Sequence, residues 1–578
     1  MVQPKYHSDF AEWAASLEYF FLARRWFRRP WAIIETARLS PQIWWGWPMR
    51  QIFGAMFLLI TLFSGAACRD GQTAAGAADR GKGTPFDVVE ASISDIHSAM
   101  RAGTLSSREL VQFYLDRIEA YDKQGPALNA IITINPYALA RADELDRLFA
   151  SSGMVGPLHG IPVIVKDNYD TSDLPTSAGS LSLAGSMPPD DSFQVRRIRE
   201  AGAIVLAKSN MAEFAFTPYE TVGSALPGHT RNPYALNRVP AGSSGGTAAA
   251  VAASFGAVGL GTDTGNSIRG PSSHNALVGI RSTMGLTSRD GIVPLYFDHD
   301  IGGPMARTVE DAVTVFDVIA GHDPADPVTS ASLEHRSLDY TKILEADPLR
   351  GARIGVMRQW SNRQGADTDV LARFEEALVD LEKAGATIID PVTIPEMDAL
   401  QESGLWCPRF KWDLNQYLAS RGSAAPYPDL EAIIASRQFH PQIRPRMERG
   451  QAVEEPPDSN PTCLRSLENR ELLRAAVRRQ LEEHRLDAMV YPTWSNPPRL
   501  IGDLNTPHGD NSQDLSPGTG FPAVTVPMGY VQEDLPVGLQ FFGDAWSDDR
   551  LIALAYAYEQ ATHHRRPPVT TPPLARNH

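Results

Sequence analysis

Cysteine is scarce in this sequence. The 578 residues contain three cysteines, Cys68, Cys407 and Cys463. Three are too few for a fold held together by disulfides. Their spacing includes no Cys-x-x-Cys pair and no cluster with histidine of the kind that binds zinc. The sequence therefore gives no indication of a disulfide scaffold or a metal site, and we expect neither a metal nor an organic cofactor.

An excess of basic residues is also missing. Lysine and arginine total 53 against 68 aspartates and glutamates, which gives a formal net charge of −15. Proteins that bind nucleic acid normally present a basic face, so we expect no nucleic-acid partner. The length allows one large core or more than one domain. There is no internal repeat and no low-complexity block.

Long hydrophobic runs are absent as well. The apolar run at residues 52–63 is too short for a comfortable membrane-spanning helix. Met49-Arg50 precedes it and small residues follow it up to Cys68, which is the order of a secretory signal. A cysteine after small residues resembles a bacterial lipoprotein box, although Gly65 stands where that box usually has leucine. We expect an exported protein of the periplasm or cell envelope, with membrane contact only through a lipid anchor on Cys68.

The segments on either side of this signal differ from it in composition. Residues 1–48 are rich in tryptophan and arginine and fit poorly before a signal peptide. Our hypothesis is that translation begins at Met49, and the alternative is an amphipathic extension that lies on a membrane surface. Residues 69–85 are rich in glycine and alanine and are typical of a flexible tether. The signal peptide then spans residues 49–68, and the folded domain spans 86–578.

Small residues dominate residues 242–283, and this segment organises the rest of the chain. It begins Gly242-Ser243-Ser244-Gly245-Gly246 and continues through an alanine-rich stretch to Gly261 and Gly265. Glycine permits backbone conformations closed to other residues and lets the backbone approach a ligand closely. Because that freedom costs stability, we interpret the segment as functional.

Lys166 ends a short apolar run. Residues 161–165 are continuously apolar and mostly β-branched, with Pro162 at the start, which predicts a buried strand. A lysine at the end of such a strand is costly to bury in its charged form, so its pKa should fall from about 10.4 toward neutrality. The alternative is an ion pair with a nearby carboxylate such as Asp167.

Together these motifs resemble the amidase signature family. The matching residues are Lys166-Asp167-Asn168, the Gly-Ser-Ser-Gly-Gly turn at 242–246, Gly261-Thr262-Asp263, and Asn266-Ser267-Ile268-Arg269. The resemblance covers most of residues 88–568 and is weakest between about 340 and 480. It implies a single α/β domain with a large mixed, twisted β-sheet and helices on both faces.

The resemblance also implies a catalytic triad. Ser267 matches the nucleophile, Lys166 the base and Ser243 the bridging serine, which in the family follows a cis peptide bond. Backbone N–H groups of Thr264, Gly265, Asn266 and Ser267 are the expected oxyanion hole, because they lie on one turn and form a concavity for negative charge.

One position departs from the family pattern. Asn266 stands where most members have glycine. Asparagine tolerates left-handed backbone geometry better than other non-glycine residues, so we expect the turn to survive and the side chain to project near the pocket. We expect Asp263 and Arg269 to brace this loop by hydrogen bonds.

A rival interpretation makes Ser244 the nucleophile of an α/β-hydrolase elbow, Gly-x-Ser-x-Gly. That motif requires a buried strand immediately before it and a later histidine with a carboxylate. Residues 232–240 are polar and interrupted by proline, and His274, His508 and His563 have no evident carboxylate partner. The sequence therefore disfavours this interpretation.

The rest of the chain alternates helical and strand patterns. Ser106 stands three residues before Glu109, which predicts a capping box at the start of a helix. Residues 194–201 predict a helix and 203–207 a strand, which indicates a parallel sheet. Residues 353–356, 369–384 and 387–389 predict a strand, a helix and a strand with right-handed crossover. Strands are also expected near 487–493, 520–527 and 538–543, and a final helix at 551–562. Asn210, Met211 and Glu213 are expected to be structural or to line the pocket.

Regular patterns loosen between about 396 and 480, where the family's acyl pocket varies. Aromatic residues are scattered there and packing is their commonest role; they include Trp406, Phe410, Trp412, Tyr417 and Phe439.

We predict a serine amidohydrolase acting on a carboxamide or anilide, with ester hydrolysis as a side activity. The alternatives are a glutaminase-type component of a tRNA-dependent amidotransferase, and a non-catalytic lipid-anchored binding protein. The sequence does not predict the oligomeric state.

Overall fold

The computed structural model describes residues 86–575, apart from 217–218, 338 and 346. The predicted upstream extension, signal peptide and linker, with Cys68, lie outside the described residues. No helix within the described residues has the length and apolar character needed to cross a membrane.

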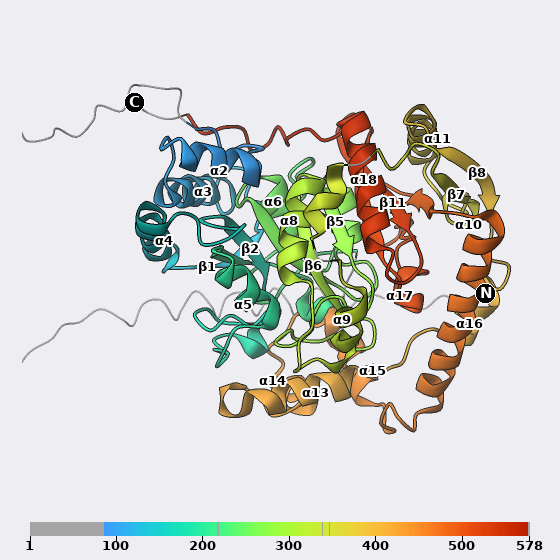
Figure 1. The fold of residues 1–578 in the computed structure, drawn as a ribbon. Helices are drawn as coiled ribbons and strands as arrows, with labels where there is room; N and C mark the ends of the chain where they lie inside the picture. Colours follow the sequence, from blue (N-terminus) through green and yellow to red (C-terminus); the bar gives the residue numbers. More distant parts are fainter. Residues whose placement is uncertain (1–85, 217–218, 338, 346, 576–578) are drawn as a thin grey trace, which may run out of the picture. The chain divides into compact units, whose positions relative to one another are not determined.

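One mixed sheet forms the centre of the described part of the chain. Its strand order is β1-β3-β2-β4-β6-β5-β10-β11-β9-β7-β8 (Figure 1). Strands β2 and β3, β2 and β4, β7 and β8, and β7 and β9 pair in parallel, and the remaining neighbours pair antiparallel. The strands are β1 (Ile131–Ile134), β2 (Pro162–Lys166), β3 (Ile204–Ser209), β4 (Val258–Asp263), β5 (Val278–Arg281), β6 (Ile301–Ala306), β7 (Arg353–Met357), β8 (Thr387–Val392), β9 (Ala488–Pro492), β10 (Ala523–Val531) and β11 (Leu535–Phe542). The predicted fold class is confirmed.

Helices cover both faces of this sheet. The principal ones are α2 (Ile93–Arg101), α3 (Ser107–Tyr121), α4 (Ala138–Ser152), α5 (Phe193–Glu200), α6 (Gly245–Ala252), α7 (Arg269–His274), α8 (Val309–Ile319), α11 (Thr368–Lys383), α12 (Met397–Ser403), α13 (Phe410–Arg421), α14 (Leu430–Ser436), α15 (Arg444–Gln451), α16 (Pro461–His484) and α18 (Asp548–Thr562). The predicted capping box of α3 is present, because Ser106 and Glu109 each accept a hydrogen bond from the other's backbone N–H.

The two faces of the central strands differ in side-chain size. Val258 and Leu260 of β4 join the main apolar core together with residues of α8 and α18. On the other face a Cβ added to Gly259 would lie 2.5 Å from Thr247 of α6. Because successive residues of a strand point to opposite faces, the glycines let α6 approach the sheet closely.

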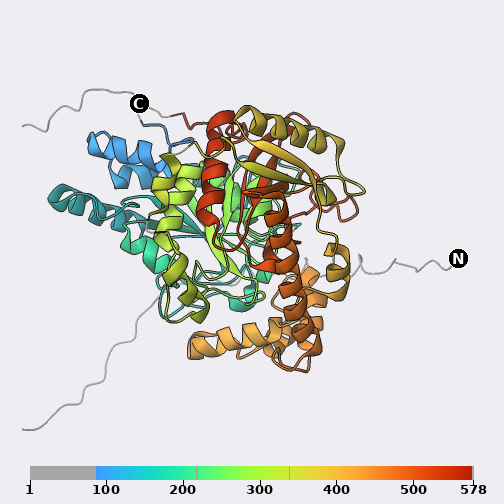
Figure 2. The same cartoon turned by 45° about the vertical axis from the view of Figure 1, so that its right-hand side comes forward.

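The sheet has a helical group at each end. Figures 1 and 2 show α2, α3 and α4 near the β1 edge, and α11 with β7 and β8 at the other edge. The predicted unit of β7, α11 and β8 is confirmed, since β7 and β8 are parallel and α11 joins them. Strands β1, β4, β5 and β6 were not predicted. Strand β6 contains two glycines and a proline, which are poor strand formers, yet every residue of β6 is buried and the strand lies between β4 and β5.

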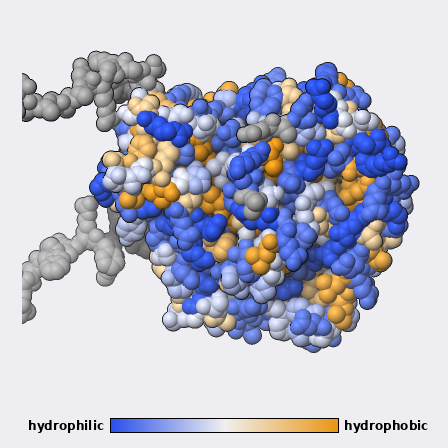
Figure 3. Space-filling view, viewed as in Figure 1, coloured by the Kyte–Doolittle hydropathy of each residue, from blue (hydrophilic) through white to orange (hydrophobic). Residues whose placement is uncertain are grey.

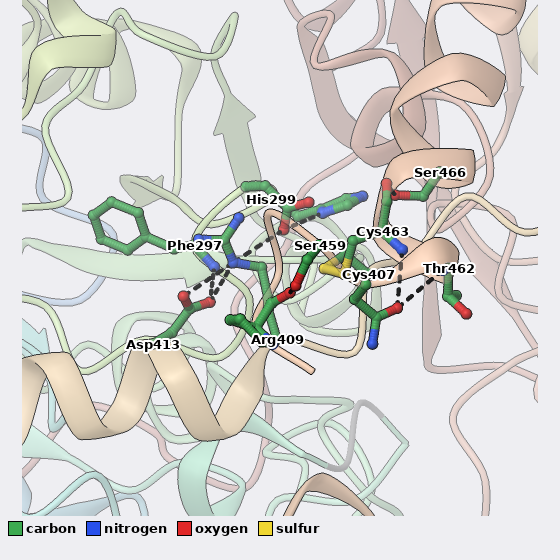
Figure 4. The surroundings of a disulfide bond; sticks show 12 residues. Phe297, His299, Cys407, Arg409, Asp413, Ser459, Thr462, Cys463 and Ser466 are labelled. Carbon is green, nitrogen blue, oxygen red and sulfur yellow. Dashed lines mark hydrogen bonds and ion pairs between the residues drawn. A yellow bond between two sulfur atoms is a disulfide. The ribbon is translucent and has the colours of Figure 1, made fainter. Parts of the chain in front are cut away.

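The loosely patterned region folds into helices α12 to α16. Figure 1 shows α13, α14 and α15 below the sheet and α16 along its right-hand side. Cys407, in the loop before α13, forms a disulfide with Cys463 at the start of α16 (Figure 4). The sequence analysis excluded a disulfide scaffold and did not foresee this single bond, because two cysteines separated by 56 residues carry no pairing signal.

The molecular surface on the side shown in Figure 3 is mainly hydrophilic, with apolar residues dispersed in small groups. This view therefore shows no broad apolar patch of the kind that marks a large contact surface.

Candidate active site

The site begins where two neighbouring strands end. Strands β2 and β4 pair in parallel, so their carboxyl ends meet at the same edge of the sheet. Lys166 is the last residue of β2 and Asp263 the last of β4. The turn 264–267 that follows β4 therefore lies beside the lysine.

Lys166 is fully buried and makes three polar contacts. Its Nζ lies 2.7 Å from Ser243 Oγ, 2.7 Å from Thr262 Oγ1 and 3.3 Å from the Thr262 carbonyl oxygen. Burial lowers the pKa of Lys166 to about 7, while the negative charges of Asp263 and Asp300 act in the opposite direction. The pKa of Lys166 therefore falls toward neutrality, as the sequence analysis expected. The alternative pairing fails, because Asp167 lies 3.6 Å from Lys208 and forms its ion pair there.

Ser243 follows a cis peptide bond with Gly242, as the family resemblance implies. Its side chain is fully buried, and that of Ser267 is 4% exposed. In the described part of the chain no hydrogen bond joins Ser243 Oγ to Ser267 Oγ. The Ser244 N–H donates to the Ser267 carbonyl oxygen at 3.3 Å, which holds the two segments side by side. Catalytic contacts are often long in an unliganded site and shorten when substrate binds.

The turn after β4 faces a pocket of about 510 Å³. All four predicted oxyanion-hole residues, Thr264, Gly265, Asn266 and Ser267, line it. Their backbone N–H groups donate to no acceptor within residues 86–575, so they are free for a ligand. The pocket is the size of a small-molecule site.

Asn266 lies at the pocket, as expected, but without left-handed backbone geometry. Its φ is not positive. Its side chain is fully buried, and its Nδ2 donates to Asp510 Oδ2 at 2.6 Å. The asparagine therefore ties the turn to a distant loop, and no left-handed residue is required at this position.

The glycines of the Gly-Ser-Ser-Gly-Gly turn also serve a different purpose from the one inferred. None of the five glycines singled out has a positive φ. A Cβ on Gly245 would lie 2.0 Å from Thr221 Oγ1, and one on Gly246 would lie 2.2 Å from the Asn210 carbonyl oxygen. Close packing against neighbouring chain segments, rather than conformational freedom, requires glycine here.

A buried ion-pair cluster braces the turn. Arg269 and Arg281 both lie against Asp263, at 3.0 Å and 2.9 Å, and all three side chains have no exposed surface. The two arginines outweigh the effect of burial and lower the pKa of Asp263 to about 2. Asp263 also accepts from the Ile268 N–H at 3.1 Å. The predicted bracing role of Asp263 and Arg269 is confirmed, and Arg281 is an addition.

The structure does not support Ser244 as a nucleophile. Ser244 is fully buried, and its hydroxyl donates to the Thr262 carbonyl oxygen at 3.2 Å. The described residues between β3 and Ser244 contain no strand. His274 lies against Trp494 and the Asn496 carbonyl oxygen, and burial lowers its pKa to about 3. Ser244 forms no hydrogen bond with a histidine within residues 86–575.

Other predicted site residues divide between pocket and core. Trp406 and Phe410 line the pocket, whereas Tyr417 donates to Asp170 and Phe439 packs in an apolar cluster. Asn210, Met211 and Glu213 are buried and do not line the pocket, so their role is structural.

Sequence reasoning missed several polar residues of the site. Thr262 contacts Lys166, Asp300 accepts from Thr264 Oγ1 at 2.5 Å, and Asp510 accepts from Gln513 Nε2 at 2.7 Å. Thr262 belongs to the Gly261-Thr262-Asp263 motif, so its hydroxyl could have been predicted to lie at the site. Asp300 and Asp510 belong to no recognised motif, and nothing in the sequence predicts their position. Within residues 86–575 no group of three or more His, Cys, Asp or Glu side chains is placed to hold a metal ion.

Comparison with known proteins agrees with this geometry. The amidase family model matches residues 109–552. The chain therefore belongs to the amidase family and is a hydrolase of amide C–N bonds. The predicted relationship to the amidase signature family is confirmed.

Three relatives show the extent of the similarity. A probable amidase of Arabidopsis thaliana is 35% identical over 504 residues, which cover 84% of this chain and 92% of the plant protein. One of the subunits of the glutamyl-tRNA(Gln) amidotransferase of Acinetobacter baumannii is 34% identical over 487 residues, which cover 82% of this chain and 97% of the bacterial protein. The X-ray structure of native peptide amidase from Stenotrophomonas maltophilia superposes with a TM-score of 0.76 at 40% identity and covers 84% of this chain and 99% of that one.

Proposed function

We propose that this protein is a serine amidohydrolase that cleaves a carboxamide or anilide C–N bond through an acyl-enzyme on Ser267. One observation carries the proposal. A buried lysine with a pKa of about 7 lies 2.7 Å from Ser243 Oγ, beside a turn whose Ser267 faces a pocket. A neutral amine, a hydroxyl and a pocket-lining hydroxyl are the parts that nucleophilic catalysis requires.

The proton moves along this series in the first step. Neutral Lys166 accepts the proton of Ser243 while Ser243 Oγ accepts the proton of Ser267. Ser267 Oγ then bonds to the carbonyl carbon, and the carbonyl electron pair moves to oxygen. Collapse of this tetrahedral intermediate breaks the C–N bond, and the protonated lysine returns the proton through Ser243 to the leaving amine. Water repeats the sequence on the acyl-enzyme and releases the acid.

Acylation and deacylation each pass through a tetrahedral intermediate with a negatively charged oxygen. We assign the binding of this oxyanion to the turn after β4. The free N–H groups of residues 264–267 belong to one pocket-lining turn, which is fixed by the cluster around Asp263. Preorganised donors of this kind stabilise negative charge as it develops, and removing one costs about a hundredfold or more in rate.

Linear amides are the proposed substrates, with amides of peptides as the first class to test. The similarity to a peptide amidase at 40% identity supports this choice, as does a pocket with aromatic walls at Phe216, Tyr296 and Trp406. Esters are proposed as secondary substrates, because their hydrolysis uses the same nucleophile and oxyanion hole.

The test combines active-site labelling with a substrate screen. A fluorophosphonate probe should modify Ser267 of the wild-type protein and leave the Ser267→Ala variant unlabelled. The same pair of proteins is assayed on aliphatic amides, anilides, peptide amides and esters. Labelling at Ser244, or turnover that survives Ser267→Ala, contradicts the proposal. A protein that neither labels nor turns over any substrate would be the non-catalytic binding protein.

A glutaminase role within an amidotransferase is the second candidate, favoured by the 34% identity to one of the amidotransferase subunits. Release of ammonia from free glutamine, measured with and without the other amidotransferase components, separates the two candidates. We expect amide hydrolysis without any partner.

We also propose export to the cell envelope, with lipidation of Cys68. The Cys407–Cys463 disulfide supports this location, because such bonds persist mainly in oxidising compartments. Fractionation with amino-terminal sequencing of the mature protein tests it. A cytosolic protein that retains residues before Met49 contradicts the proposal.

A further inference from the structure

The pocket above Ser267 contains two positive charges and no negative one among the described residues. Arg446 and Arg449 of α15 line it, and no aspartate or glutamate does. The other lining residues are uncharged, and five of them are aromatic: Phe216, Tyr219, Tyr296, Trp406 and Phe410. A bound molecule thus meets apolar walls and two guanidinium groups.

Neither guanidinium is neutralised by a carboxylate of the described chain. Arg446 donates to the backbone carbonyl oxygen of Phe216. The side chain of Arg449 forms no hydrogen bond or ion pair with any residue in 86–575. The buried carboxyl of Asp510, behind the oxyanion turn, is engaged by Asn266 and Gln513 and has a pKa raised by burial to about 7. The positive charge of the pocket therefore lacks an internal counter-charge.

The same helix provides a contrast. Arg444 lies 2.7 Å from Glu448, one turn further along α15, and neither residue lines the pocket. Residues three or four positions apart share a helix face, so 444 and 448 lie on one side and 446 and 449 on another. Met447 is fully buried in the apolar cluster beneath and fixes the orientation of the helix. The arginines without a carboxylate partner are those that line the pocket.

We propose that the pocket selects amides whose acyl part carries a carboxylate, such as a peptide amide with aspartate or glutamate beside the amidated residue. The inference rests on the proposed function, because Ser267 marks where the scissile carbonyl lies. The aromatic walls hold the apolar part of the acyl group, and Arg446 and Arg449 pair with its carboxylate. Both arginines remain accessible to solvent, so each pairing is worth a few-fold in affinity rather than several orders of magnitude.

Three peptide amides that differ only in charge test the inference. The probes are N-acetyl-Glu-Phe-amide, N-acetyl-Gln-Phe-amide and N-acetyl-Lys-Phe-amide, and kcat/KM is measured at low ionic strength. For the wild type we expect the glutamate probe to exceed the glutamine probe by roughly tenfold, with the lysine probe lowest. Added salt should reduce the ratio, because accessible charges are screened.

Substitutions in α15 test whether Arg446 and Arg449 cause the preference for the glutamate probe. Arg449→Met should lower the Glu/Gln ratio several-fold, and Arg449→Glu should raise the lysine probe above the glutamate probe. Arg446→Met combined with Arg449→Met should bring the ratio close to one. Arg444→Met is the matched control, since it removes an arginine from the same helix but outside the pocket, and it should leave the ratio unchanged. Equal effects of Arg444→Met and Arg449→Met overturn the inference.

Binding to the Ser267→Ala variant separates this inference from the proposed function. Calorimetric titration with the same three probes should give the order Glu, Gln, Lys. If the wild type hydrolyses all three equally and Ser267→Ala binds them equally, the charge inference is wrong and the amidase proposal stands. If no probe is hydrolysed but binding follows the charge order, the inference stands and the proposed reaction on these peptides is wrong.

Discussion

Lys166 Nζ and Ser243 Oγ are 2.7 Å apart in a part of the protein from which solvent is excluded. They belong to segments 77 residues apart in the sequence. The contact places a lysine whose pKa is lowered by burial to about 7 against a hydroxyl beside the turn that contains Ser267. The first prediction follows from the protonation of this lysine.

Activity should rise with pH through about 7. Lys166 acts as a base only when neutral, so kcat/KM should increase about tenfold per pH unit well below 7 and level off above it. A pH–rate profile between 5 and 9 measures this. Lys166→Arg should be inactive at every pH, because a guanidinium stays charged.

Asp510 also titrates near 7, so the profile must be repeated in Asp510→Asn. A rising limb that disappears in this variant while activity persists would assign the titration to Asp510 instead of Lys166.

The contact between Asn266 and Asp510 should position the oxyanion turn. Asp510→Ala removes the acceptor of Asn266 Nδ2 and of Gln513 Nε2. We expect kcat to fall about tenfold to a hundredfold, because a small displacement of catalytic donors has a large effect on rate. Asp510→Asn keeps an acceptor oxygen and should recover part of the loss. A change in KM alone would place Asp510 in substrate binding and contradict a positioning role.

The contribution of the buried cluster around Asp263 to the stability of the fold should depend on pH. The pKa of Asp263 is lowered in the folded protein from 3.8 to about 2. Its ionised form therefore stabilises the fold above pH 4 by about 2 kcal/mol, and this contribution is lost as the pH falls from about 4 to 2.

Asp263→Asn should lower the free energy of unfolding by about 3–5 kcal/mol at pH 7, since it leaves Arg269 and Arg281 buried without their counter-charge. The difference from wild type, measured by urea unfolding, should shrink below pH 4. Asp143→Asn breaks the exposed pair with Arg108 and serves as the control, with an expected loss under about 1 kcal/mol. Equal losses at the two sites would contradict the assignment.

The Cys407–Cys463 bond should stabilise the pocket wall. Cys407 lies between Trp406 and Pro408, both of which line the pocket. Changing both cysteines to serine should lower the free energy of unfolding by about 2–4 kcal/mol and raise KM more than it lowers kcat. Reductant should produce the same change in the wild type and none in the double variant. A wild type insensitive to reductant would contradict this prediction.

The sequence predicted the elements with strong local patterns. The run ending at Lys166, the capped helix at Ser106 and the β7–α11–β8 unit all depend on spacing within a few residues. It did not predict β1, β4, β5 or β6. In β6, Gly302, Gly303 and Pro304 are poor strand formers on their own. Buried neighbours on both sides of β6 override that weak preference.

For the site, the sequence alone predicted Lys166, Ser243 and Ser267 as the residues that carry the chemistry, and it predicted the strand that ends at Lys166. The motifs at Lys166, Ser243 and Ser267 are local, and a buried strand that ends in lysine already indicates a shifted pKa. The tertiary structure decided which partners those residues meet. Asp510 approaches Asn266 from 244 residues away, and the arginines of α15 reach the pocket across a similarly long stretch of chain. Such contacts depend on packing between distant segments, and the spacing of residues along the chain does not predict them.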